Sequence, residues 1–306
     1  MSKSPRSLFL LLCAVLAACG PAEQKERSGR LRIVATTGIV ADAARRIAGE
    51  LASVEALMGP GVDPHLYKAS ESDVRRLAEA DLILYNGLHL EGKMGDILTK
   101  MARSRPVAAV SEDLPENLLR EPPEFAGQYD PHIWFDVSMW RETLAPIARE
   151  LAALDPEHAA EYEANAAAYQ QELDELDGWV QQQIGSLPPE RRVLVTAHDA
   201  FGYFGRRYGM EVIGIQGIST LSEAGTADVD RVADLVVNKK VKSVFVESSV
   251  PRRSIEAVQA AVRSRKHEVS IGGQLFSDSL GAADKPEGTY PGMVRANVNT
   301  IVAALR

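Results

Sequence analysis

The sequence predicts an α/β fold made of two lobes of about four parallel strands each, joined by one long helix. Three observations lead to this prediction. Short β-rich runs alternate with helical patterns over roughly residues 31–110, and the same alternation restarts after Pro189. Between these two parts, residues 156–184 form a continuous helical pattern rich in Ala, Glu and Gln. Alternating strands and helices are typical of parallel sheets with crossover helices.

In the first half, each expected strand is a short apolar run. These runs are residues 31–36, 53–58, 81–86 and 106–110. Helices are expected at 39–52 and 70–80, and a further helix is expected to begin near Val137. Ser70 stands at the start of the second helix with Asp73 three residues later, which is the spacing of a capping box.

The long helical pattern contains no proline after its first turn, and Gly185 and Pro188-Pro189 end it. At 1.5 Å per residue such a helix would be about 40 Å long, enough to cross a whole domain. We interpret it as a connector between two lobes. An ordinary packed helix of a single domain is the alternative.

The second half repeats the alternation. Its expected strands are residues 193–196, 211–215, 243–247 and 267–271. Its expected helices are residues 200–208, 226–239 and 254–264.

The first residues predict an export signal and not a part of the fold. Lys3 and Arg6 precede an apolar stretch, residues 8–18, that is too short to span a bilayer as an ordinary helix. The stretch ends in Leu16-Ala17-Ala18-Cys19-Gly20, which resembles a bacterial lipobox. We therefore predict a lipoprotein signal peptide at 1–18, lipid attachment at Cys19 and a polar tether at 19–30. A plain secretory signal with a chance cysteine is the alternative.

Composition narrows the chemistry of the mature chain. Its two cysteines, Cys13 and Cys19, both lie in the signal region, so no disulfide or thiolate metal site is expected in the folded body. Any metal must be held by nitrogen and oxygen. The formal net charge of −8 argues against nucleic acid as a partner and is compatible with a cation as the ligand.

The chain has only six histidines, and two of them end identical tripeptides. These tripeptides are Asp63-Pro64-His65 and Asp130-Pro131-His132. Proline fixes its own φ and restricts the residue before it, so both imidazoles are displayed on stiff turns. A third histidine, His198, follows a predicted strand.

Placement in the predicted sheets brings four side chains together. In open parallel sheets, ligands bind beyond the carboxyl ends of the strands. His65 lies in the loop after the second strand of the first lobe, and His198 and Asp278 follow strands of the second. His132 lies in the loop before the helix expected to begin near Val137. Three imidazoles and one carboxylate suit a divalent first-row metal ion.

Each of these residues also has a structural interpretation. A single loop histidine is usually a hydrogen-bonded surface residue. Asp199 is a plausible helix cap beside His198, and Asp278 can cap a helix in its Ser-Asp-Ser turn. Glu247, at the end of a strand, could bind the metal itself, orient a ligand or cap the following turn, and we favour the last two roles. Of the remaining histidines, His89 follows a strand end and is the hardest to dismiss, whereas His158 and His267 lie on polar stretches and are not expected to bind metal.

Seven segments in order resemble the zinc/manganese (cluster 9) metal-binding lipoproteins, the solute-binding components of bacterial metal ABC transporters. These segments are residues 61–68, 85–91, 130–134, 196–204, 216–220, 245–248 and 275–280. The resemblance implies two Rossmann-like (β/α)₄ lobes at 31–155 and 188–306, linked by one long rigid helix at 156–187. It also implies that the metal ligands are His65, His132, His198 and Asp278.

The function implied by the resemblance is capture and delivery, not catalysis. The chain is expected to be an extracytoplasmic, lipid-anchored monomer, on the periplasmic side or the cell surface, that passes a single Mn²⁺ or Zn²⁺ to a membrane permease. Residues 111–128 lack the histidines that zinc-specific members often carry, and residues 216–225 resemble the manganese branch. Both favour Mn²⁺, although three nitrogens and one carboxylate intrinsically bind Zn²⁺ more tightly.

Two other function classes stay open at this point. Three histidines plus a water form a catalytic zinc site, so a metal-dependent hydrolase is the first alternative. Asp278 would fill the open position, and only Glu247 is available as a separate general base. A surface adhesin is the second alternative, which lipid anchoring permits but nothing in the sequence requires.

Overall fold

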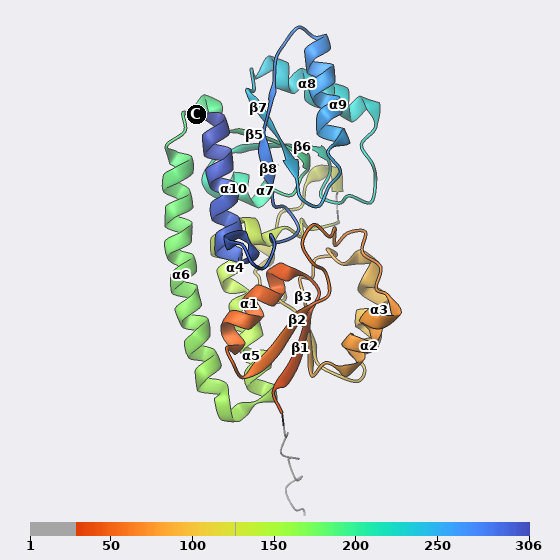
Figure 1. The fold of residues 1–306 in the computed structure, drawn as a ribbon, viewed down its shortest axis with the longest axis vertical. Coiled ribbons are helices and arrows are strands. Elements are labelled where there is room, and N and C mark those ends of the chain that lie inside the picture. Colours follow the sequence, from red (N-terminus) through yellow and green to blue (C-terminus); the bar gives the residue numbers. More distant parts are fainter. Residues whose placement is uncertain (1–28, 126) are drawn as a thin grey trace, which may run out of the picture. The chain divides into compact units, whose positions relative to one another are not determined.

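The first sheet contains four parallel strands in the order β2-β1-β3-β4 (Figure 1). Its strands are β1 (Leu31–Ala35), β2 (Ala52–Ala56), β3 (Leu82–Tyr85) and β4 (Val107–Ala109). The structure is a computed structural model that describes residues 29–125 and 127–306. The predicted signal peptide, Cys19 and nearly all of the tether lie outside these residues.

Five helices accompany this sheet, which together we call lobe one. They are α1 (Gly38–Ala48), α2 (Glu71–Glu79), α3 (Gly95–Met101), α4 (Val137–Glu142) and α5 (Leu144–Leu154). Short 3₁₀ turns occur at Gly92–Met94, Glu116–Leu118, Pro123–Phe125 and Ile133–Phe135. The predicted capping box is confirmed, since Ser70 Oγ accepts from the backbone of Asp73 and the Asp73 carboxylate accepts from the backbone of Ser70.

The long helix α6 spans Ala159–Gly185 and follows a 3₁₀ turn at Pro156–His158. Figure 1 shows it running along lobe one and on to the level of the second group of strands. It packs against helices of lobe one and against α10 (Tyr290–Leu305) at the end of the chain. The predicted arrangement of two lobes and one long helix is confirmed, whereas the lobe boundaries at 155/156 and 187/188 remain predictions.

The second group of strands, with its helices, is lobe two. The strands are β5 (Val193–His198), β6 (Glu211–Gln216), β7 (Ser243–Glu247) and β8 (Ser270–Leu275). The helices are α7 (Gly202–Tyr208), α8 (Thr226–Asn238), α9 (Arg253–Ser264) and α10, with 3₁₀ turns at Pro189–Arg191 and Pro286–Gly288. The strands pair as two parallel ladders, β5-β6 and β7-β8, with β5 and β7 in contact between them.

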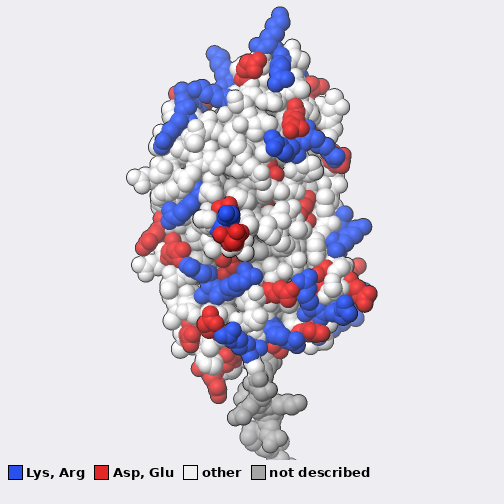
Figure 2. All heavy atoms as spheres, in the orientation of Figure 1, with Lys and Arg blue, Asp and Glu red and all other residues white. Residues whose placement is uncertain are grey.

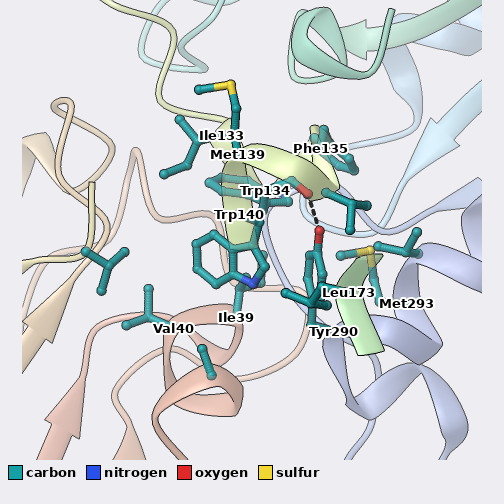
Figure 3. Close-up of a cluster of buried hydrophobic side chains, with 14 of the residues drawn as sticks. Ile39, Val40, Ile133, Trp134, Phe135, Met139, Trp140, Leu173, Tyr290 and Met293 are labelled. Atoms are coloured by element: carbon teal, nitrogen blue, oxygen red, sulfur yellow. Dashed lines mark hydrogen bonds between the residues drawn. The ribbon is translucent and has the colours of Figure 1, made fainter. Parts of the chain in front are cut away.

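A continuous hydrophobic core runs through both lobes and the long helix. It contains Ile33 of β1, Leu173 of α6 and Phe245 of β7 in one cluster. Figure 3 shows its centre, where Trp134 and Trp140 lie near Tyr290 of α10. The Tyr290 hydroxyl donates to the Trp134 carbonyl at 2.7 Å, which ties the last helix to the loop that carries His132.

Three predicted boundaries were wrong for identifiable reasons. Helix α1 ends at Ala48 and not at residue 52, because Gly49 adopts φ +56° and ends the helix. The long helix begins three residues later than predicted, after a proline-led 3₁₀ turn. Strand β8 starts at Ser270 and not at residue 267, and it continues through Gly272 and Gly273 to Leu275.

The glycines of β8 make room for the last helix. A side chain at Gly272 would lie 2.7 Å from Cβ of Ala304, and one at Gly273 would lie 2.5 Å from Cγ2 of Thr300. Gly273 also has φ +146°, and the pairing with β7 shifts register between Val244 and Phe245. A sequence that looks like a turn is therefore a strand on which α10 packs closely.

The surface carries many charged side chains. On the face in Figure 2, basic and acidic side chains are interspersed, without a continuous basic area. In the described part of the chain, no helix is both long and apolar enough to cross a membrane.

Candidate metal centre

Three of the four predicted ligand residues end or follow strands, and the fourth precedes a helix. His65 lies in the loop after β2, His198 is the last residue of β5, and Asp278 follows β8. His132 stands directly before the 3₁₀ turn that leads into α4. All four are buried, with exposed fractions of 0–3%.

The structure brings these four side chains together around one point. Nε2 of His132 lies 3.3 Å from Nε2 of His65 and 3.3 Å from Nε2 of His198. The two oxygens of Asp278 divide between the histidines, with Oδ1 at 3.5 Å from Nε2 of His132 and Oδ2 at 3.5 Å from Nε2 of His198. One ligand atom from each residue lies within 4.8 Å of the others.

These separations fit a divalent transition metal. Zinc–nitrogen bonds of about 2.0–2.1 Å in a tetrahedron put neighbouring nitrogens roughly 3.3 Å apart. Asp278 Oδ1 is buried and accepts no hydrogen bond from residues 29–125 or 127–306. A buried carboxylate oxygen without a donor, facing three imidazole nitrogens, is what a cation would satisfy.

The repeated Asp-Pro-His tripeptide has the same local structure in both copies. The backbone N–H of His65 donates to Asp63 Oδ1 at 2.9 Å, and that of His132 donates to Asp130 Oδ1 at 3.0 Å. Each aspartate thus closes an Asx turn that holds the histidine two residues on. The repeat is a turn used twice to display an imidazole.

Carboxylates lie behind two of the three rings. Nδ1 of His132 is 2.7 Å from Asp130 Oδ1, and Nδ1 of His198 is 2.6 Å from Glu247 Oε2. Glu247 Oε1 also accepts the backbone N–H of His198 at 2.9 Å. Such contacts fix the ring orientation and direct Nε2 to the centre. Glu247 therefore lies behind the ring of His198, outside the group of four.

The pKa shifts follow from burial and these carboxylates. Burial lowers the pKa of His65 to about 3, so its ring is neutral. Burial also opposes protonation of His198, but Glu247 and Asp278 outweigh it and raise its pKa well above the usual range. The pKa of His132 is raised too, because Asp130 and Asp278 outweigh its burial. Burial disfavours the Asp278 carboxylate, but His198 and His132 hold its pKa well below the ordinary value.

The other residues considered from the sequence do not join the centre. His89 is exposed and has φ +63° in a left-handed turn after β3. His158 contacts Asp155 before α6, and His267 precedes β8. Neither Asp199 nor Asp278 caps a helix: α7 begins after Phe201 without a side-chain cap, and Asp278 faces the histidines.

The sequence interpretation missed residues that support the centre from a distance. The Arg120 guanidinium contacts Asp130 Oδ2, and it lies 3.6 Å from Asp199 of lobe two. Thr220 Oγ1 donates to Asp63 Oδ2 at 2.6 Å. Arg120 lies ten residues before Asp130 and Thr220 lies 157 residues after Asp63, and neither position belongs to a local motif that would have revealed its contact.

Residues 33–304 match the family described as zinc-uptake complex component A, periplasmic (ZnuA). The chain belongs to this family. The match includes all four clustered residues and every strand, apart from the first two residues of β1.

Individual relatives of this family are similar over nearly the full chain. The zinc-binding protein TroA of Treponema pallidum is 51% identical over 279 residues, which cover 90% of this chain and 89% of TroA. The manganese-binding lipoprotein MntA of Bacillus subtilis is 47% identical over 307 residues and 100% of both chains. The solved structure of the periplasmic zinc-binding protein TroA from Treponema pallidum has a TM-score of 0.88 at 50% identity, covering 90% of this chain and 99% of that one.

Proposed function

We propose that this protein captures one divalent transition metal ion through His65, His132, His198 and Asp278 and delivers it to the permease of an ABC transporter for uptake. The observation that carries the proposal is the buried group of three imidazoles and one carboxylate in a chain of the ZnuA family. The metal is cargo: it enters between the lobes, is held without water access, and leaves unchanged.

We favour Mn²⁺ as the cargo, with Zn²⁺ close behind. Three nitrogens and one carboxylate bind zinc more tightly by intrinsic affinity. The two Asp278 oxygens each approach a different imidazole at 3.5 Å, which supports bidentate binding and a coordination number above four. A higher coordination number favours manganese over tetrahedral zinc. The names of the relatives do not decide between the metals, since TroA is a zinc-binding and MntA a manganese-binding protein.

Lipid attachment at Cys19 is part of the proposal. The signal pattern supports it, as does the resemblance over the full length to a protein named a lipoprotein, MntA of Bacillus subtilis. A tether over residues 19–30 would then hold a monomeric receptor outside the membrane, beside its permease.

Catalysis is not part of the proposed function. A catalytic zinc site keeps one position open for water, whereas here Asp278 occupies the fourth side of the centre. Glu247, the one candidate general base, contacts both the backbone and the ring of His198. Hydrolysis of esters, phosphates or peptides by the metal-loaded protein, lost in Glu247→Gln, would favour the hydrolase alternative.

Metal titration tests the proposal. The purified mature chain, stripped of metal, is titrated with Mn²⁺ and with Zn²⁺, and the two ions are then placed in competition. We expect saturation at one equivalent for each ion. Saturation at several equivalents, or no binding of either ion, would refute the proposed function.

Affinity should depend on pH. The raised pKa values of His132 and His198 mean that the metal-free centre holds protons that a metal must displace. Since falling pH favours the protonated rings, affinity should weaken by about tenfold per pH unit for each displaced proton. Calorimetric titrations between about pH 5 and pH 8 measure this, and an affinity that stays constant over the range would contradict it.

A further inference from the structure

The two Asp-Pro-His turns differ in what holds their aspartates. In both turns one carboxylate oxygen accepts the histidine backbone N–H. The other oxygen of Asp130 contacts Arg120, ten residues earlier in lobe one. The other oxygen of Asp63 accepts the Thr220 hydroxyl at 2.6 Å, across 157 residues and from lobe two. The second carboxylate oxygen is therefore held from within lobe one at Asp130 and from lobe two at Asp63, although the Asp130 carbonyl also accepts from the Tyr203 hydroxyl of lobe two at 2.9 Å.

The position of His65 depends on its Asx turn, whereas the rings of His132 and His198 are also held by carboxylates. Asp130 and Glu247 contact the rings of His132 and His198 from behind. Within the described part of the chain, the hydrogen bonds of His65 are its backbone bond to Asp63 and its Nε2 contact with His132. Asp63 is thus the residue that fixes where the His65 ring can lie in the absence of metal.

The loop that carries His65 joins β2 to α2 of lobe one and makes two hydrogen bonds to lobe two. The backbone N–H of Gly61 donates to Ser279 Oγ at 2.9 Å, and Thr220 holds the loop again two residues before His65. Thr220 is buried, with 6% of its surface exposed. Leu66, near Asp63 in the chain, is 44% exposed, and Leu221, next to Thr220, is 56% exposed. A pocket of about 310 Å³, lined in part by Asp63, Leu66 and Thr220, opens next to this contact. The contact between the lobes lies directly below the surface.

We propose that Thr220 is a positioning residue that controls metal release: its hydrogen bond to Asp63 latches the His65 turn to lobe two. The proposal rests on the proposed metal-binding function. Separation of the lobes at this edge breaks the bond, leaves Asp63 Oδ2 without its donor and frees His65 from its fixed position. Because the bond forms only when both lobes are in place, its loss accelerates dissociation and has little effect on capture.

The test measures release of Mn²⁺ and of Zn²⁺ from the loaded protein into excess chelator by stopped flow. Thr220→Val removes the hydroxyl at nearly constant shape, and Thr220→Ser keeps it. Ser219→Ala removes a hydroxyl of the same loop, one that accepts the Leu221 backbone N–H at 3.3 Å. Because a hydrogen bond to a charged group is stronger than one between neutral groups, its loss in Thr220→Val should make metal release about tenfold to hundredfold faster. Thr220→Ser and Ser219→Ala should stay within about threefold of the wild type.

A double-mutant cycle separates the latch from a general loosening of the loop. If Thr220 acts through Asp63, then Asp63→Asn also accelerates release, and adding Thr220→Val to it changes the rate little further. Thermal unfolding of each metal-free variant verifies the fold, and Asp63→Asn carries the test if Thr220→Val does not fold.

Several outcomes overturn the proposal. Release from Thr220→Val at the wild-type rate, equal acceleration by Ser219→Ala, or additive effects in the cycle would each do so. A wild-type protein that binds neither ion would instead refute the proposed function itself.

Discussion

Replacing His132 by alanine should weaken binding of both Mn²⁺ and Zn²⁺ at least about a hundredfold. His132 stands at the middle of the centre: its Nε2 is 3.3 Å from the nitrogens of both other histidines and 3.5 Å from Asp278. Loss of a residue behind a ligand typically costs 10–100-fold in metal affinity, and loss of a ligand should cost more. Competition with a chelator of known affinity measures the change.

A matched control separates loss of a ligand from loss of a histidine. His158 is half-exposed, contacts Asp155 before the long helix, and does not belong to the centre. His158→Ala should keep wild-type affinity. If His132→Ala binds metal as tightly as this control, the ligand assignment is wrong.

Replacing Trp140 by alanine should cost about 3–5 kcal/mol in the free energy of unfolding of the metal-free protein. Trp140 is fully buried in the core of Figure 3, where its ring lies 5.6 Å from that of Tyr290. Tyr290 belongs to the last helix and donates to the Trp134 carbonyl, so the substitution opens a cavity where the last helix meets lobe one. Urea denaturation followed by circular dichroism measures the loss.

Trp179 of the long helix provides the control for size and residue type. Its ring is partly buried and lies under Arg295 at 4.8 Å. Trp179→Ala should cost about 1 kcal/mol, as an average substitution does. Equal losses in the two variants would mean that the core around Trp140 does not dominate stability.

Local signals predicted most of the fold. Each β-rich run of the sequence corresponds to a strand. The signal is clearest in β3, β5 and β7, where burial on both faces selects continuous apolar residues in a parallel sheet. The capping box at Ser70 was visible because both of its partners lie within three residues. Three helices have no counterpart in the predictions: α3, α5 and α10. For α10, Pro291 and Gly292 suggest a turn, yet proline is favoured in the first turn of a helix, and Gly292 fits against the Pro286 carbonyl.

The candidate site was predictable where it depends on strand ends and not where it depends on contacts between distant segments. His65, His132, His198 and Asp278 were singled out because they follow parallel strands or stand on proline-stiffened turns, and the structure brings them together. Arg120 and Thr220 carry no such signal. Each becomes meaningful only when folding places it against an aspartate of a histidine-bearing turn.

The most direct measurement is anomalous X-ray scattering from crystals of the metal-loaded protein, collected at the absorption edge of the bound ion. Our account predicts one strong peak, bonded to Nε2 of His65, His132 and His198 and to the Asp278 carboxylate, at about 2.0–2.2 Å for zinc. A strongest peak at any other place, or a loaded crystal without a peak among these four side chains, would contradict it.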